Sequence, residues 1–242
     1  MGLQTRDVPA AVLAGGLATR LGSVTGKIPK ALVEVAGRPF VDHQLALLQR
    51  HGFAHVVFCV GYLGEQIEGH LGDGTDRGLS IQYSYDGDRL LNTAGALRRA
   101  LPQLGNTFWV MYGDSYMDID YAAVLAEFER RRARALMTLI HNDNRWDRSN
   151  AEYRDDRLVA YDKRQPTTEM QHIDYGVALL SRDVVERVPP DGPYDLADLY
   201  RELVAEGSMI GYVVTERFYE IGSPAGLEET RQHLMGRSGE RR

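Results

Sequence analysis

The sequence has little of several features that would define whole classes of protein. Its 242 residues include one cysteine, Cys59, so an internal disulfide is excluded and a reducing cytoplasm is the expected location. No apolar run approaches ~20 residues and no charged-then-apolar leader precedes Val8, so we expect neither export nor membrane spanning. Basic residues are not in excess: the net charge is −6, which argues against a nonspecific nucleic-acid binder. No internal repeat or low-complexity linker is visible.

What is present is an ordinary soluble composition, 43% hydrophobic and 26% charged, with strand and helix patterns that alternate through the first half. Apolar and β-branched runs predict strands over 8–13, 55–60, 80–85 and 108–112, and a short strand over 31–35. Helical spacing predicts helices over 40–48, 64–71 and 93–101. This alternation favours parallel βαβ units in a doubly wound sheet, whose ligand lies at the carboxyl ends of the strands.

The second half is less regular. We expect a small antiparallel subdomain around Tyr153, 158–162 and 173–180, and a last helix capped by Ser223 with Pro224 at its first position. The chain is interpreted as one domain over 1–242, with halves of about 8–115 and 116–235 and a tail over 236–242. The remaining predicted elements are a helix over 121–132, a strand over 135–140, helices over 182–188 and 196–206, and strands over 210–214 and 218–221.

A glycine-bearing loop follows the first predicted strand. Small residues let backbone N–H groups approach a ligand closely, and successive N–H groups form a concavity that binds anions. Nearby cations add positive charge, so the segment predicts a local phosphate site. The residues concerned are Gly15, Gly16, Thr19, Arg20, Lys27 and Lys30.

This loop matches neither the P-loop nor the G-x-G-x-x-G dinucleotide fingerprint. It resembles the N-terminal signature of the sugar-phosphate nucleotidyltransferases, L-A-[GA]-G-x-G-T-R-L-x-x-L-T-x-x-x-P-K-P-L. The resemblance implies a Rossmann-like, mostly parallel mixed sheet of the nucleotide-diphospho-sugar transferase type, with the antiparallel subdomain on the sugar side. The residues in register are Leu13, Ala14, Gly15, Gly16, Thr19, Arg20, Leu21, Thr25, Pro29, Lys30 and Leu32.

Asp114 directly follows an apolar strand, where a carboxylate can hold Mg²⁺ together with substrate phosphates, although Gly-Asp is also a common turn. The resemblance implies that Asp114 and Glu220 are the metal ligands. Glu220 also has a purely structural interpretation, as a partner of Arg217 or of a helix N-terminus.

The resemblance also assigns the other site residues. Arg20 and Lys30 are the implied catalytic residues, and Arg20 also contacts the nucleotide. The implied nucleotide-binding set adds Leu13, Ala14, Gly15, Gly16, Thr19, Asp88, Thr93 and Gly95. The implied sugar-phosphate set is Lys163, Asp174, Tyr175 and Gly176.

The implied reaction is Mg²⁺-dependent transfer of a nucleoside monophosphate from a nucleoside triphosphate to a sugar 1-phosphate. Residues 70–88 resemble the heptose 1-phosphate guanylyltransferases and the N-acetylmuramate 1-phosphate uridylyltransferases. Asp86 or Asp88 can accept from guanine N1–H and N2–H₂, which favours GTP and a heptose 1-phosphate. The alternatives are uridylyl or thymidylyl transfer to another hexose 1-phosphate, cytidylyl transfer to a non-sugar phosphate, and a non-catalytic nucleotide-sugar sensor. We expect a monomer or small homo-oligomer that binds neither nucleic acid nor membrane.

Overall fold

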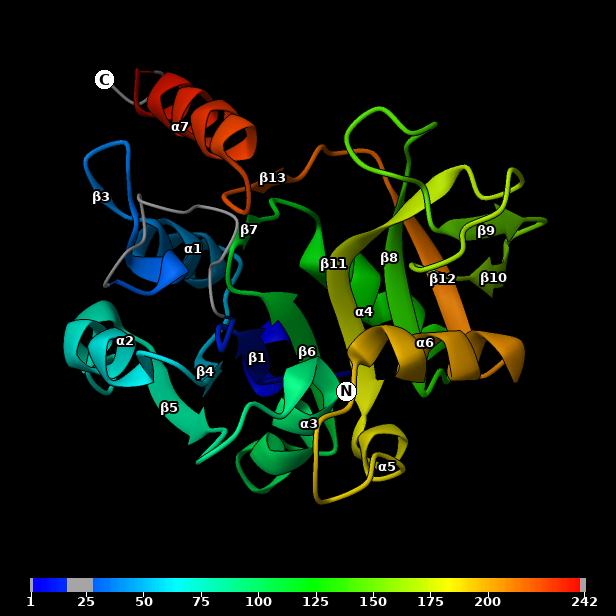
Figure 1. The fold of residues 1–242 in the computed structure, drawn as a ribbon, viewed down its shortest axis with the longest axis horizontal. Helices are drawn as coiled ribbons and strands as arrows, with labels where there is room; N and C mark the ends of the chain where they lie inside the picture. Colours follow the sequence, from blue (N-terminus) through cyan, green and yellow to red (C-terminus); the bar gives the residue numbers. More distant parts are fainter. Residues whose placement is uncertain (1, 17–27, 240–242) are drawn as a thin grey trace.

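A computed structural model describes residues 2–16 and 28–239. Its centre is a nine-stranded mixed sheet (Figure 1). Four neighbouring strands are parallel, in the order β5, β4, β1, β6. Strand β11 is antiparallel and pairs with both β6 and β8. Strand β8 also pairs in parallel with β12. These strands are β1 (Ala10–Leu13), β4 (His55–Val60), β5 (Ser80–Tyr85), β6 (Thr107–Tyr112), β8 (Ala135–His141), β11 (His172–Ser181) and β12 (Met209–Val214).

Helices cover both faces of the sheet, as the doubly wound prediction requires. One apolar cluster joins the sheet to α1 (Phe40–Arg50), α2 (Gly64–Leu71) and α4 (Tyr121–Arg130). A second cluster joins the other face to α3 (Asn92–Ala100), α5 (Arg182–Val185) and α6 (Leu196–Ala205). In Figure 1, α6 lies in front of the sheet and α4 behind it. The fold class predicted from the sequence is confirmed.

Three small antiparallel pairs complete the architecture. The hairpin of β9 (Ala151–Arg154) and β10 (Arg157–Tyr161) joins the large sheet through β11, at the predicted place of the antiparallel subdomain. A second hairpin pairs β2 (Glu34–Val35) with β3 (Arg38–Pro39). The third pair joins β7 (Ser115–Tyr116), just after β6, to β13 (Tyr219–Glu220), near the end of the chain. Short 3₁₀ turns cover Thr5–Asp7, Lys30–Leu32, Thr75–Arg77 and Leu101–Gln103.

The last helix, α7 (Pro224–Gly239), packs against the β2–β3 hairpin and the β7–β13 pair around a third apolar cluster (Figure 1). Ser223 caps it as predicted, because its Oγ accepts a hydrogen bond from the Gly226 N–H at 3.0 Å. The helix extends to Gly239, so the prediction of a tail from residue 236 was wrong for 236–239. These residues continue the last turns of α7.

One carboxylate links α7 to α1. Asp118 accepts hydrogen bonds from Arg50, His51 and Arg237, each at 2.7 Å. The hydrogen bond from His51 and the charge of Arg50 hold the pKa of Asp118 well below its usual range. No helix in residues 2–16 and 28–239 is both long and apolar enough to cross a membrane.

Candidate active site

A cavity of about 410 Å³ opens at the carboxyl ends of the parallel strands. Gly15 follows β1 and Gly61 follows β4, and the two backbones approach so closely that a Cβ on Gly15 would lie 3.1 Å from the Gly61 nitrogen. Gly15 and Gly16 line the cavity and give it a bare floor where backbone groups can contact a ligand. Predicted residues that line the cavity are Leu13, Ala14, Gly15, Gly16, Lys30, Thr93 and Asp114.

Lys30 and Asp114 meet in this cavity although 84 positions separate them in the sequence. The Lys30 Nζ donates to Oδ2 of Asp114 at 3.0 Å, and both side chains are partly exposed. Asp114 lies in the turn between β6 and β7, and buried Gln44 of α1 fixes that turn. The Gln44 Nε2 donates to the carbonyls of Tyr112 (2.9 Å) and Ser115 (3.0 Å), on either side of Asp114.

Glu220 lies beside Asp114 but outside the residues that line the cavity. Pairing of β13 with β7 sets Glu220 opposite Ser115, and a Cβ placed on Gly222 would contact Oε2 of Glu220 and lie 3.5 Å from Oδ2 of Asp114. The Glu220 carboxylate accepts from the Gly222 N–H and from the Ser223 hydroxyl at 2.9 Å. Glu220 is thus a neighbour of Asp114 and also a partner of a helix N-terminus, as its structural interpretation predicted.

The donor set suits a magnesium ion. Mg²⁺ in proteins usually takes one or two carboxylates and completes its shell with water and substrate phosphates. Asp114 and Glu220 offer two carboxylates near one point, next to a cavity with a backbone floor suited to phosphates. Within residues 2–16 and 28–239, no group of three or more His, Cys, Asp or Glu side chains gathers as a metal site, so the protein supplies few ligands there.

Among the described residues, two that were predicted to bind the nucleotide, Asp88 and Gly95, do not line the cavity. Asp88 is exposed, because Gly87, with φ +83, turns the chain away after β5. Asp86 lines the cavity instead and is only 6% exposed. Its Oδ2 accepts from the Leu91 N–H at 3.1 Å, and burial raises the pKa of its carboxyl. Thr19 and Arg20, two further predicted residues, lie outside the described residues.

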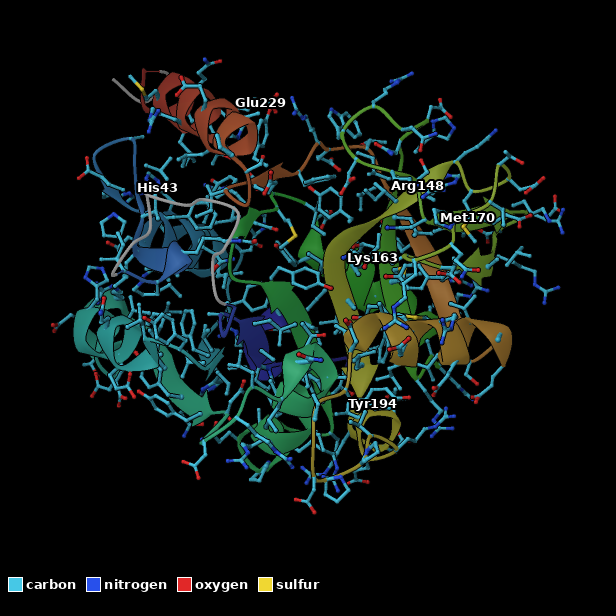
Figure 2. All side chains as sticks on the ribbon, viewed as in Figure 1. His43, Arg148, Lys163, Met170, Tyr194 and Glu229 are labelled. Atoms are coloured by element: carbon cyan, nitrogen blue, oxygen red, sulfur yellow. The ribbon has the colours of Figure 1, made fainter. Side chains whose placement is uncertain are left out.

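Gly95 has a packing role in α3. A Cβ there would lie 3.0 Å from the Gly192 carbonyl, and its N–H donates to the Tyr194 carbonyl at 3.1 Å. The loop before α6 therefore crosses α3 at this glycine, and Tyr194, labelled in Figure 2, marks that loop. Asn92, at the start of α3, has φ +57, a conformation that asparagine tolerates better than most residues.

The predicted sugar-side residues lie around β11. Lys163 is exposed, beside β11 in Figure 2, and its Nζ lies 5.8 Å from the centre of the Tyr112 ring, which lines the cavity. Asp174 accepts from the Gly176 N–H at 3.0 Å; its removal from water raises the pKa of its carboxyl, and the charge of Lys163 opposes that rise. Tyr175 was misassigned as far as its side chain is concerned, because alternation along β11 directs it into the core, where it is 2% exposed.

Sequence reasoning missed Asp195 and Tyr112 as lining residues of the cavity. Asp195 precedes α6 and caps it, since its Oδ1 accepts from the Ala197 N–H at 3.0 Å. The same oxygen accepts from the Thr93 hydroxyl at 3.3 Å, across 102 positions of sequence. Asp-Leu before an apolar helical pattern is a cap signal, but nothing local indicates that the cap faces Thr93.

Comparisons with known proteins agree with this geometry. The mannose-1-phosphate guanylyltransferase of Mycobacterium tuberculosis is 29% identical over 227 residues, which are 92% of this chain and 63% of that protein. The N-acetylmuramate alpha-1-phosphate uridylyltransferase of Neisseria meningitidis is 42% identical over 115 residues, which are 47% of this chain and 50% of that protein. The chain thus spans between half and two thirds of the length of these relatives.

Among solved structures, HddC from Yersinia pseudotuberculosis complexed with GMP-PN superposes with a TM-score of 0.77 at 22% identity, covering 94% of this chain and 99% of that one. This likeness supports the same fold. Residues 9–150, more than half of the chain, match the nucleotidyl transferase family. The chain belongs to that family, as its glycine loop, Lys30 and Asp114 indicate.

Proposed function

We propose that the protein transfers a nucleoside monophosphate from a nucleoside triphosphate to a sugar 1-phosphate, releasing pyrophosphate and forming a nucleoside diphosphate sugar. Our first choice of substrates is GTP and a heptose 1-phosphate. The observation that carries the proposal is the cavity in which the glycine floor, Lys30 and Asp114 converge. Family membership and the relatives that act on sugar 1-phosphates support it.

The chemistry asks for alignment and charge neutralisation more than for a base. A sugar 1-phosphate oxygen is already an anion when it attacks the α-phosphorus in line, while pyrophosphate leaves. Lys30 lies where it can neutralise the α-phosphate or the attacking phosphate. We assign the sugar phosphate to Lys163, and the triphosphate and leaving pyrophosphate to Arg20, where a planar guanidinium suits two oxygens.

We propose that Asp114 and Glu220 hold Mg²⁺, because Mg²⁺ in proteins usually takes one or two carboxylates. A bound Mg²⁺ supplies Lewis-acid neutralisation of phosphate charge at this end of the cavity. Asp114 also orients Lys30 through their 3.0 Å contact, so replacement of Asp114 removes a metal ligand and frees the lysine together.

The strand order suggests how the substrates divide the cavity. β5 and β6 are separated by β4 and β1, so their ends are three strand spacings, roughly 14 Å, apart. Asp86 follows β5, and Tyr112 ends β6, with the phosphate-binding floor between them. This order favours the base beside Asp86 and the sugar beside Tyr112.

Asp86 favours guanine as the base, and it replaces Asp88 as the proposed nucleotide-binding carboxylate. One of its oxygens holds the Leu91 N–H, and within the described residues the other has no hydrogen-bond partner. Each carboxylate oxygen has two lone pairs, so Asp86 can still accept from the paired N1–H and N2–H₂ donors of guanine while it holds the Leu91 N–H. Uracil and thymine offer only one such N–H, and their carbonyls would face the carboxylate.

The test is pyrophosphate release with Mg²⁺, crossing GTP, UTP, CTP, ATP and dTTP with a panel of sugar 1-phosphates and with phosphocholine. We expect release that needs GTP with a heptose or mannose 1-phosphate and that falls about 10²- to 10³-fold or more in Asp114→Asn. Release with UTP or dTTP would retain the reaction class and replace the base. Release with CTP and phosphocholine would favour the non-sugar alternative. Nucleotide binding without release from any pair would leave only a sensor.

A further inference from the structure

One cavity residue remains without a role in the proposed reaction. Asp195 holds the Ala197 N–H and the Thr93 hydroxyl with the same oxygen, Oδ1. Thr93 is fixed in turn, because its Oγ1 accepts from the Leu196 N–H at 2.7 Å. Within the part of the chain that the structure describes, Oδ2 of Asp195 has no hydrogen-bond partner, and the residue lines the cavity. A rigidly held carboxylate thus offers one free acceptor to whatever enters.

The surroundings of Tyr112 place this acceptor at the sugar end. Asp195 and Tyr112 line the same cavity. Burial raises the pKa of the Tyr112 phenol, and the charges of Asp174, Asp195 and Asp114 add to that rise. Lys163, the proposed holder of the sugar phosphate, lies over the same ring. The sugar end therefore combines a phosphate-binding cation with carboxylates on several sides.

We propose that Asp195 is a specificity-determining residue: its Oδ2 accepts a hydrogen bond from a ring hydroxyl, and the surrounding carboxylates select a neutral sugar. The inference rests on the proposed function and narrows its substrate class. An ionised carboxylate only accepts hydrogen bonds. It can therefore bind a hydroxyl of the substrate, but it offers no hydrogen-bond donor to an acid group of the substrate. A uronate or a lactyl ether, as in N-acetylmuramate, brings a like charge to this wall, and like charges discriminate against a wrong ligand.

Capping alone does not explain this arrangement. Asp120 caps α4 in the same way, with Oδ1 accepting from the Ala123 N–H at 2.9 Å, and it lies outside the residues that line the cavity. A helix cap needs only one carboxylate oxygen. Asp195 has a second one, and unlike Asp120 it lines the cavity. Asp120→Asn is therefore a matched control for Asp195→Asn. In both variants the remaining amide oxygen can still accept from the helix N–H groups.

The experiment measures kcat/KM of the wild type and both variants for three kinds of substrate, with the best nucleoside triphosphate. The first is a neutral manno-configured sugar 1-phosphate, the second a set of its monodeoxy analogues, and the third glucuronic acid 1-phosphate and N-acetylmuramate 1-phosphate. We expect the wild type to prefer the neutral sugar by about tenfold or more. One deoxy analogue should lose about tenfold in the wild type and less in Asp195→Asn, because a neutral amide in place of the charged acceptor weakens the hydrogen bond that this analogue lacks.

In Asp195→Asn the preference for the neutral over the acidic sugars should shrink by about tenfold, while Asp120→Asn should match the wild type. The inference is overturned if the wild type uses an acidic sugar as well as the neutral one. It is also overturned if every deoxy analogue loses equally in the wild type and in Asp195→Asn. Both of these outcomes leave the transferase itself active. Absence of pyrophosphate release from every pair would overturn the proposed function and this inference together. The wild-type measurements stand even if Asp195→Asn fails to fold.

Discussion

Glu220 offers a prediction that separates a metal ligand from a structural residue. Its carboxylate lies beside Asp114 and also accepts from Gly222 and Ser223 at the start of α7. Glu220→Gln removes the charge and keeps one oxygen, which can accept from the Gly222 N–H while the amide nitrogen faces the Ser223 Oγ. Ser223→Ala does the reverse, because it removes the helix cap and one partner of Glu220 and leaves the carboxylate charged.

The two substitutions should therefore differ in what they change. Loss of an N-cap hydroxyl costs about 1 kcal/mol of unfolding free energy, which corresponds to roughly 2–4 °C in Tm for a chain of this size. Ser223→Ala should show that shift and keep most of its activity. Glu220→Gln should keep Tm within about 2 °C, lose about 10²- to 10³-fold in kcat, and need more Mg²⁺ for half-maximal rate.

Thermal unfolding and pyrophosphate release over a Mg²⁺ titration measure both quantities on the same preparations. The reasoning fails if Glu220→Gln retains its rate and its Mg²⁺ half-saturation within about threefold while Ser223→Ala loses activity. That result would make Glu220 a partner of α7 alone, with Asp114 as the carboxylate that serves the metal. An equal loss of Tm in the two variants would show that a glutamine cannot replace the cap contacts.

Three further predictions concern side chains around the site and the core. Gln44→Leu should lower the unfolding free energy by about 2 kcal/mol and raise the Mg²⁺ half-saturation, since the turn carrying Asp114 loses two donors; unchanged Mg²⁺ dependence would contradict this. Asp118→Asn should cost about 1–3 kcal/mol at pH 7 in urea unfolding. Folding lowers the pKa of Asp118, so its contribution to the unfolding free energy is fully present above the unfolded pKa of about 3.9. That contribution is lost as pH falls through the folded pKa. The difference in unfolding free energy between wild type and variant should therefore narrow below about pH 4. Burial raises the pKa of Cys59 to about 12, so a disulfide reagent at pH 8 should label it only in urea, and fast labelling of the native protein would refute the burial argument.

The fold was predictable where local pattern and burial agree. Strands such as His55–Val60 are apolar on both faces because helices cover both sides of the sheet, and such runs are legible without a structure. Short elements were less so. The prediction of a strand over 31–35 was wrong at its start, because Lys30–Leu32 form a 3₁₀ turn after Pro29. The two-residue strand Ser115–Tyr116, which the sequence analysis does not predict, depends on a partner about a hundred positions away.

The site was predictable where one segment contains the whole signal. The glycine loop and Lys30 are contiguous, and Asp114 is adjacent to a strand end, so the carboxyl edge of the sheet brings them together. Asp195 and Gln44 act through contacts that chain position does not disclose, because one binds Thr93 and the other binds carbonyls near Asp114. Asp86 and Asp88 are equivalent in the sequence, and only the φ +83 turn at Gly87 separates them.

The charges of the residues that line the cavity bear on the role of the loop motif between Gly16 and Lys30. Among the described residues that line the cavity, Lys30 is the sole cation, whereas Asp86, Asp114 and Asp195 are three carboxylates. A chain with a net charge of −6 offers no general attraction for a triphosphate and a sugar phosphate. Two mutually repelling anions can therefore bind together only if cations from beyond these lining residues compensate them. Lys163 at the sugar end, Mg²⁺ at Asp114, and Arg20 within the motif bracketed by Gly16 and Lys30 are the proposed sources. We therefore expect the acidic wall, which is proposed to disfavour an acidic sugar, to make nucleotide binding depend on the metal as well.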